Sequence, residues 1–90
     1  MGRSARDKPR KLGKKLKMIR VDVLQLSQTE MAKALDLKVN YAAVSQYERG
    51  TREPSLLVLL KYARLIGIST DVLIDDKLDL MPNLSSSRGR

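Results

Sequence analysis

The side chains of residues 41–49 offer hydrogen bonding rather than covalent chemistry. If this segment is helical, five of its side chains share one face, at spacings i, i+1, i+4, i+5 and i+8: Tyr41, Ala42, Ser45, Gln46 and Arg49. This face combines small residues with an amide, a hydroxyl and a cation, and nothing on it suits covalent catalysis. Such a face can enter a groove and form hydrogen bonds there.

The composition argues against an enzyme and against a metal site. The chain has no Cys and no His, so it lacks thiolate ligands, the usual general base and the commonest metal ligand. Asp75 and Asp76 are adjacent carboxylates without converging partners, and such pairs are more often solvated than bound to metal. No nucleophile–base pair can be drawn either. We therefore expect no catalytic residues, no metal and no cofactor.

Two short helices are expected to position the face at residues 41–49. Ser27 and Glu30 have the spacing of a capping box, in which each side chain accepts from the backbone N–H of the other. The apolar residues that follow fall on one helical face: Met31, Ala32 and Leu35. Asn40 is a favourable N-cap for the second helix, and Gly50 can supply the left-handed turn that ends it.

Three sequence motifs resemble those of a known family. The motifs are LSQTEMAKAL, VSQYERGTREPS and LLKYARLIGIS, and together they resemble the helix-turn-helix regulators of the Cro and phage-repressor type, also called the xenobiotic-response-element family. The resemblance covers residues 12–74. It implies an all-α fold, a five-helix lambda-repressor-like DNA-binding domain whose third helix enters the major groove. The alternative is an unrelated small helical bundle.

The resemblance implies roles for exposed residues around the third helix. Gln46 is the best candidate for reading a base edge, because a side-chain amide can pair with N6 and N7 of adenine. Gln28 corresponds to a glutamine that meets a DNA phosphate at a helix start, although an ordinary exposed polar residue is the alternative. Tyr41 can equally stack on the protein's own surface or bind a phosphate. The other candidate DNA-binding residues here are Ala42, Ser45 and Arg49 on the reading face and Thr51 and Arg52 on the next loop.

Arg20 and Glu48 are expected to form a structural pair. Arg20 aligns with an arginine that many relatives pair, in a partly buried position, with a glutamate late in the third helix, here Glu48. Such a pair would hold the third helix against the scaffold, and loss of one partner would leave a poorly solvated charge. The alternative is two independent surface charges.

The spacing departs from the family pattern at two places. One extra residue lies between Arg20 and Gln28. The connection between the second and third helices is about two residues longer than usual, and Asp36, which tolerates left-handed backbone, replaces the customary glycine. This longer turn leaves open where the third helix begins and whether Lys38 and Asn40 approach the DNA backbone.

The net charge of +8 comes from one end of the chain. Residues 1–20 hold nine basic side chains and one acidic side chain, whereas residues 21–90 hold nine of each. We expect residues 1–10 to form a disordered basic arm that neutralises DNA phosphates and releases counterions; a solvated tail and a nuclear-import signal are the alternatives. The residues of this end expected to contact DNA are Arg3, Arg6, Arg10 and Lys11.

Three further helices are expected to complete the bundle. The first runs from Arg10 or Lys11 to Val21 and points its lysines to solvent, namely Lys14, Lys15 and Lys17. The fourth follows the cap residue Ser55 and buries one apolar arc: Leu56, Leu59, Tyr62, Ala63 and Ile66. The last is capped by Thr70 and runs from Asp71 to Ile74.

The fourth helix has more apolar residues than one buried face requires, and this suggests a contact between subunits. Val58 and Leu65 are seven residues apart and therefore lie on one side of the fourth helix. Either the fifth helix covers them or they meet a second copy of the chain, and we favour the second copy.

The sequence as a whole predicts a DNA-binding regulator. We expect a basic arm at 1–10, a helix-turn-helix domain at 11–76 and a tail at 77–90. The expected function is sequence-specific binding of double-stranded DNA by a homodimeric transcriptional regulator, most simply a repressor, on a palindromic site. The alternative is a protein-interaction adaptor, or bridging coactivator, built on the same helical domain. With no membrane-spanning run, the expected location is the cytoplasm, in association with the nucleoid.

Overall fold

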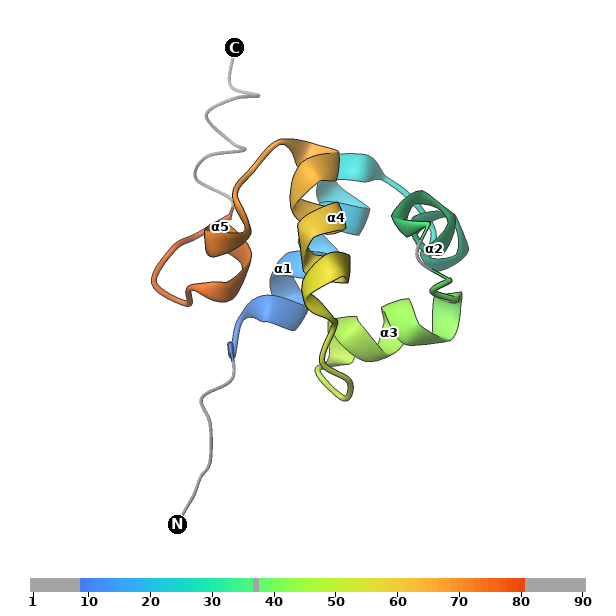
Figure 1. Ribbon diagram of the computed structural model, residues 1–90, viewed down its shortest axis with the longest axis horizontal. Coiled ribbons are helices and arrows are strands. Elements are labelled where there is room, and N and C mark those ends of the chain that lie inside the picture. Colours follow the sequence, from blue (N-terminus) through green and yellow to red (C-terminus); the bar gives the residue numbers. More distant parts are fainter. Residues whose placement is uncertain (1–8, 37, 81–90) are drawn as a thin grey trace.

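The computed structural model describes residues 9–36 and 38–80, and all regular secondary structure in this part of the chain is helical. Arg3 and Arg6 lie outside the described residues. The expected all-α fold with five α-helices is confirmed (Figure 1). The elements, in chain order, are α1 (Leu12–Met18), the π-helix η1 (Ile19–Leu24), α2 (Gln28–Leu35), α3 (Tyr41–Arg49), α4 (Leu56–Ile66) and α5 (Thr70–Ile74).

Side-chain caps fix where four of the helices begin, α2, α3, α4 and α5. The Ser27 hydroxyl accepts from the Glu30 N–H at 3.0 Å, and the Glu30 carboxylate accepts from the Ser27 N–H at 2.8 Å. The Asn40 side chain accepts from the N–H of Ala43 at 2.9 Å, so α3 begins where its N-cap predicted. For α5 the prediction was wrong by one residue. Ser69 is the cap, and Thr70 is already helical.

The first helix is longer than expected and changes type along its length. It continues past Val21 to Leu24 as a π-helix, and Gln25 then adopts a left-handed conformation with φ 56°. A π-turn contains more residues than an α-turn. The widened turn lies in the segment between Arg20 and Gln28, where the resemblance implied one extra residue.

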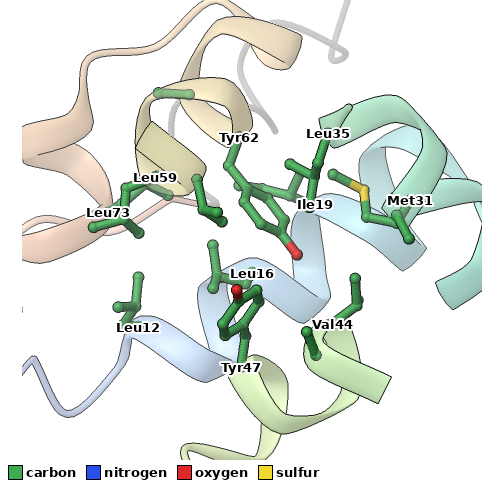
Figure 2. Close-up of a cluster of buried hydrophobic side chains, with 14 of the residues drawn as sticks. Leu12, Leu16, Ile19, Met31, Leu35, Val44, Tyr47, Leu59, Tyr62 and Leu73 are labelled. Atoms are coloured by element: carbon green, nitrogen blue, oxygen red, sulfur yellow. The ribbon is translucent and has the colours of Figure 1, made fainter. Parts of the chain in front are cut away.

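One apolar cluster joins all five α-helices. Its largest fully buried side chains come from every one of them: Leu16, Ile19, Met31, Leu35, Val44, Tyr62 and Leu73. Figure 2 shows Leu16 near the centre of this cluster, between side chains of α3 and α4. Burial raises the pKa of Tyr62, so its hydroxyl stays protonated within the cluster. This core supports α3 from one side only, which leaves the opposite side of α3 open.

Helix α4 buries a different arc from the one expected. Leu56 was expected to face inward but is 83% exposed, whereas Val58 is only 3% exposed and belongs to the core. The buried stripe is Val58, Leu59, Tyr62 and Ala63. Helix α4 packs against α5, α2 and η1. Val58 is thus unavailable as a subunit contact, while Leu65 remains 39% exposed.

Lys15 was expected in solvent, and this was wrong. Its side chain crosses from α1 to the C-terminal end of α5, and the residue is only 4% exposed. The Nζ atom donates to the backbone carbonyls of Val72 at 2.7 Å and Asp75 at 2.9 Å. The last carbonyls of a helix lack partners within it, so a lysine can cap them. Burial lowers the pKa of Lys15, and the nearby Asp76 carboxylate opposes this effect.

The packed part of the chain extends beyond residue 76. The Asp76 carboxylate accepts hydrogen bonds from the backbone N–H groups of Arg10, at 3.1 and 2.9 Å, and of Lys11, at 3.0 Å. These are free N–H groups at the start of α1, so Asp76 caps a helix at the other end of the sequence. Leu80 lies in the segment expected to be a tail, yet it is only 2% exposed and packs in the core.

Candidate nucleic-acid interface

Helices α2 and α3 are joined by a connection with two left-handed residues. Asp36 has φ 52° and ends α2, as its side chain suggested, and Lys38 has φ 58°. This backbone turns the chain sharply enough for α3 to pack against both α2 and α1. Figure 1 shows α3 along the lower edge of the bundle.

The two faces of α3 differ as the sequence indicated. Ala43, Val44 and Tyr47 are buried against the core. The five polar and small side chains lie on the other side: Tyr41, Ala42 and Arg49 are exposed, and Ser45 and Gln46 are half-buried. Tyr41 is the most exposed aromatic residue of this face, at 61%. The structure therefore presents the whole expected reading face to solvent.

The loop after α3 folds back and brings Arg52 beside Gln46. The Arg52 guanidinium donates to the Gln46 side-chain carbonyl at 3.5 Å and lies 5.9 Å from the centre of the Tyr47 ring. The Thr51 hydroxyl donates to the backbone carbonyl of Gln46 at 3.3 Å. The side-chain oxygen of Gln46 accepts a hydrogen bond from Arg52. The NH2 group of the same amide therefore points away from the loop.

Arg20 and Glu48 form the ion pair that the resemblance implied. Nε of Arg20 lies 2.6 Å from one carboxylate oxygen of Glu48, and Nη2 lies 3.0 Å from the other. The two side chains are 12% and 4% exposed, which rules out two independent surface charges. Arg20 also donates to the carbonyl of Leu26 at 3.0 Å, just before α2. The hydrogen bond to Glu48 raises the pKa of Arg20, so this link stays charged.

Gln28 is tied into the same network. Its side-chain NH2 group donates to Glu48 at 3.3 Å, and the residue is half-buried at the first turn of α2. Glu48 thus receives hydrogen bonds from both η1 and α2. The spacing of Arg20, Gln28 and Glu48 along the chain does not predict that Glu48 reaches both of the other residues.

The remaining candidate residues fall into two groups. Lys38 is exposed, and Asn40 uses its side-chain oxygen to cap α3, so both lie beside the start of that helix. Arg10 and Lys11 instead lie at the start of α1, where Asp76 binds their N–H groups. Lys11 Nζ is also 3.9 Å from Asp79, and both of these side chains are mostly exposed. Arg10 and Lys11 therefore lie at the start of α1 and not on α3 itself.

Comparison with known proteins assigns this arrangement of helices to a family. A helix-turn-helix family model matches residues 16–73, which is more than half of the chain. The chain belongs to the Cro/phage-repressor-type helix-turn-helix regulators. The match begins at Leu16 of α1 and ends at Leu73 of α5, so the Lys15 and Asp76 caps lie outside it.

A solved structure of a related fold supports the assignment to DNA-binding regulators. The P22 c2 repressor, in a complex with the synthetic operator 9T in the presence of Tl+, is 28% identical in sequence and superimposes with a TM-score of 0.63. The match covers 72% of this helix-turn-helix protein and 94% of the repressor chain. A search of curated proteins finds no significant match.

Neither comparison favours the bridging coactivator as an alternative, and the matched family consists of regulators rather than enzymes. Within the described part of this helix-turn-helix protein, no helix is long and apolar enough to cross a membrane.

Proposed function

We propose that this protein is a sequence-specific regulator of transcription, most simply a repressor, that inserts α3 into the major groove of double-stranded DNA. One observation carries the proposal. The Tyr41–Arg49 helix turns a face of small and polar side chains toward solvent, while the Arg20–Glu48 ion pair holds the same helix against the bundle. A rigidly held helix can keep hydrogen-bonding groups aligned with base edges, which gives discrimination between sequences.

On this proposal, Gln46 reads a base and neighbouring residues contribute shape or backbone contacts. The directed NH2 group of Gln46 can donate to adenine N7, and its oxygen can accept from adenine N6 while still bonded to Arg52. Ala42 and Ser45 fit close to the bases. Phosphate contacts come from the surrounding residues: Gln28, Lys38, Asn40, Tyr41, Arg49, Thr51 and Arg52.

The basic residues at the start of the chain act without regard to sequence. Arg10 and Lys11 lie at the root of this segment, which also contains Arg3 and Arg6. Their charge adds affinity for any duplex through counterion release. We place the protein in the cytoplasm, in association with the nucleoid.

We also propose that the protein binds a palindromic site as a homodimer, and that the start of α4, not Val58, forms the subunit contact. Val58 is buried, but Leu56 and Leu57 at the start of α4 are 83% and 62% exposed. These leucines directly follow the loop that leaves α3. A contact there would join two copies close to their α3 helices, as recognition of half-sites about one helical turn apart requires.

The experiment that tests the proposal selects a preferred duplex from a random pool and measures binding by fluorescence anisotropy. Gln46→Ala is expected to weaken binding to the selected duplex by about 1–3 kcal/mol and to leave random duplex nearly unchanged. Arg64→Ala, an exposed change on α4, serves as the matched control. Equal losses on both duplexes would show that Gln46 does not read sequence, and no selectable duplex would overturn the proposal.

A further inference from the structure

The start of α1 is capped by a carboxylate from the other end of the sequence. The N-cap residue, Lys11, makes no side-chain cap of its own. The N–H groups of Arg10 and Lys11 donate instead to Asp76, which lies 66 and 65 residues further along the chain. Pro9, directly before them, has no N–H group. One carboxylate therefore binds every backbone donor of residues 9–11.

Asp76 is itself held in place from both sides. The Lys15 ammonium group donates to the carbonyls of Val72 and Asp75, which immediately precede it in the fold and in the chain. Leu80, four residues after Asp76, is only 2% exposed and packs in the core. A carboxylate between two such anchors has little freedom to move. Its hydrogen bonds therefore fix the start of α1 relative to the rest of the bundle.

The start of α1 lies beside the loop that leaves α3. The two segments line one hollow of about 80 Å³, to which α1 and the residue before it contribute Gly13 and Pro9, and the loop contributes Gly50, Thr51 and Arg52. Thr51 and Arg52 are among the phosphate contacts proposed above. The segment 1–8 is thus attached to the bundle next to a loop that borders the proposed DNA-binding face.

The segment 1–8 is basic and short. It carries Arg3, Arg6 and Lys8 against Asp7. Even fully extended, eight residues span only about 28 Å. The point at which the segment is attached therefore decides which DNA phosphates its cations can reach.

We propose that Asp76 is a positioning residue for DNA binding: it fixes the attachment point of the segment 1–8, so that the cations of this segment meet phosphates next to those bound by Thr51 and Arg52. The inference rests on the proposed function and gives the segment 75–80 a part in it. Without Asp76, residues 9–11 would be released and the connecting chain would lengthen. The effective concentration of the cations at those phosphates would then fall roughly 1.5- to 2-fold.

The first experiment maps where the segment 1–8 lies on the selected duplex. The chain has no Cys, so Ser4→Cys and Glu53→Cys each create a single attachment point for an iron chelate that cleaves nearby DNA. The two labelled proteins are expected to cut overlapping sets of nucleotides. Addition of Asp76→Ala should spread the cuts made from position 4 and leave those made from position 53 unchanged. Cuts from position 4 that do not respond to Asp76→Ala would overturn the inference.

The second experiment measures binding to random duplex by fluorescence anisotropy. Asp79→Ala is the matched control for Asp76→Ala, because it removes an equal charge from a mostly exposed carboxylate of the same segment. Asp76→Ala is expected to bind roughly 1.5- to 2-fold more weakly than this control. In a full chain that also carries Arg3→Ala, Arg6→Ala and Lys8→Ala, the two variants should bind alike. Equal affinities with the basic residues intact would overturn the inference.

An insertion tests the same idea without any change to the Asp76 contacts. Gly-Ser-Gly-Ser placed between Lys8 and Pro9 separates the cations from their attachment point, and it should weaken binding to random duplex by the same roughly 1.5- to 2-fold. Wild-type affinity in this variant would overturn the inference even if Asp76→Ala failed to fold. If wild-type protein bound DNA without any salt dependence, the proposed function itself would fail, and that outcome is distinct from salt-dependent binding that the insertion leaves unchanged.

Discussion

The backbone of Gly13 on α1 lies directly against the carbonyl oxygen of Glu48 on α3. A Cβ atom at residue 13 would lie 2.6 Å from that oxygen and 3.0 Å from the carbonyl oxygen of Tyr47. Real Cβ atoms do not approach backbone oxygens this closely, so any other residue would push the two helices apart. Gly13 and Arg20, seven residues apart on α1 and η1, thus contact the same turn of the proposed recognition helix.

Gly13→Ala is therefore expected to destabilise the protein, although alanine is the better helix former. The clash should cost about 1–3 kcal/mol, as overpacking does, and this exceeds the gain of about 1 kcal/mol from helix propensity. Urea unfolding followed by circular dichroism measures the difference. Lys14→Ala, on the exposed side of α1, is a control that introduces alanine into the same helix without a clash. A more stable Gly13→Ala variant would show that α1 and α3 can separate freely.

Removal of one partner of the Arg20–Glu48 pair should be costly. Arg20→Met leaves Glu48, whose side chain is 4% exposed, without its cation, and about 3 kcal/mol of stability should be lost. The double variant Arg20→Met, Glu48→Met should recover part of that loss, because no unpaired charge remains. A double-mutant cycle of unfolding free energies measures the coupling. Strictly additive losses would mean that the pair contributes no mutual stabilisation.

The Asp76 cap predicts a specific response to acid. Hydrogen bonds from the N–H groups of Arg10 and Lys11 hold the pKa of Asp76 below its ordinary value of 3.8. The folded state therefore binds this proton less readily than the unfolded state. The stabilisation is present above 3.8 and is lost as the pH falls through the lower, folded pKa. Urea midpoints across this range should fall less steeply for Asp76→Asn than for wild type, and parallel curves would contradict the cap.

The proposed dimer contact at Leu56 and Leu57 predicts different effects for substitutions at two neighbouring residues. Leu57→Asp alters an exposed leucine, so the fold should persist while sedimentation shows a monomer. Val58→Asp places a charge in the core and should unfold the domain instead. Arg64→Ala should sediment as wild type does. A Leu57→Asp variant that remains dimeric would exclude this surface as the subunit contact.

Local chemistry accounts for the features that were correctly predicted from the sequence. The Ser27 capping box, the Asn40 cap and the buried residues of α2 and α3 depend on residues within about one or two helical turns of each other, so their spacing is sufficient to predict them. The left-handed backbone at Asp36 was likewise predicted from the residue type at that position. The Arg20–Glu48 contact spans 28 residues and came from the family resemblance, since spacing along one helix does not predict it.

The features that were missed depend on which elements pack together. Lys15 and Asp75 are 60 residues apart, and Arg10 and Asp76 are 66 apart, so their contacts exist only once α5 lies beside α1. Likewise, Leu56 and Val58 are both apolar, and only the neighbours of α4 decide which one is buried. The sequence by itself determined the presence of the helices, the N-caps of α2 and α3 and the chemical character of the α3 face, because those are properties of nearby residues. Tertiary structure alone decided which lysine is buried and which leucines are exposed, because burial depends on neighbours that the chain supplies from distant positions.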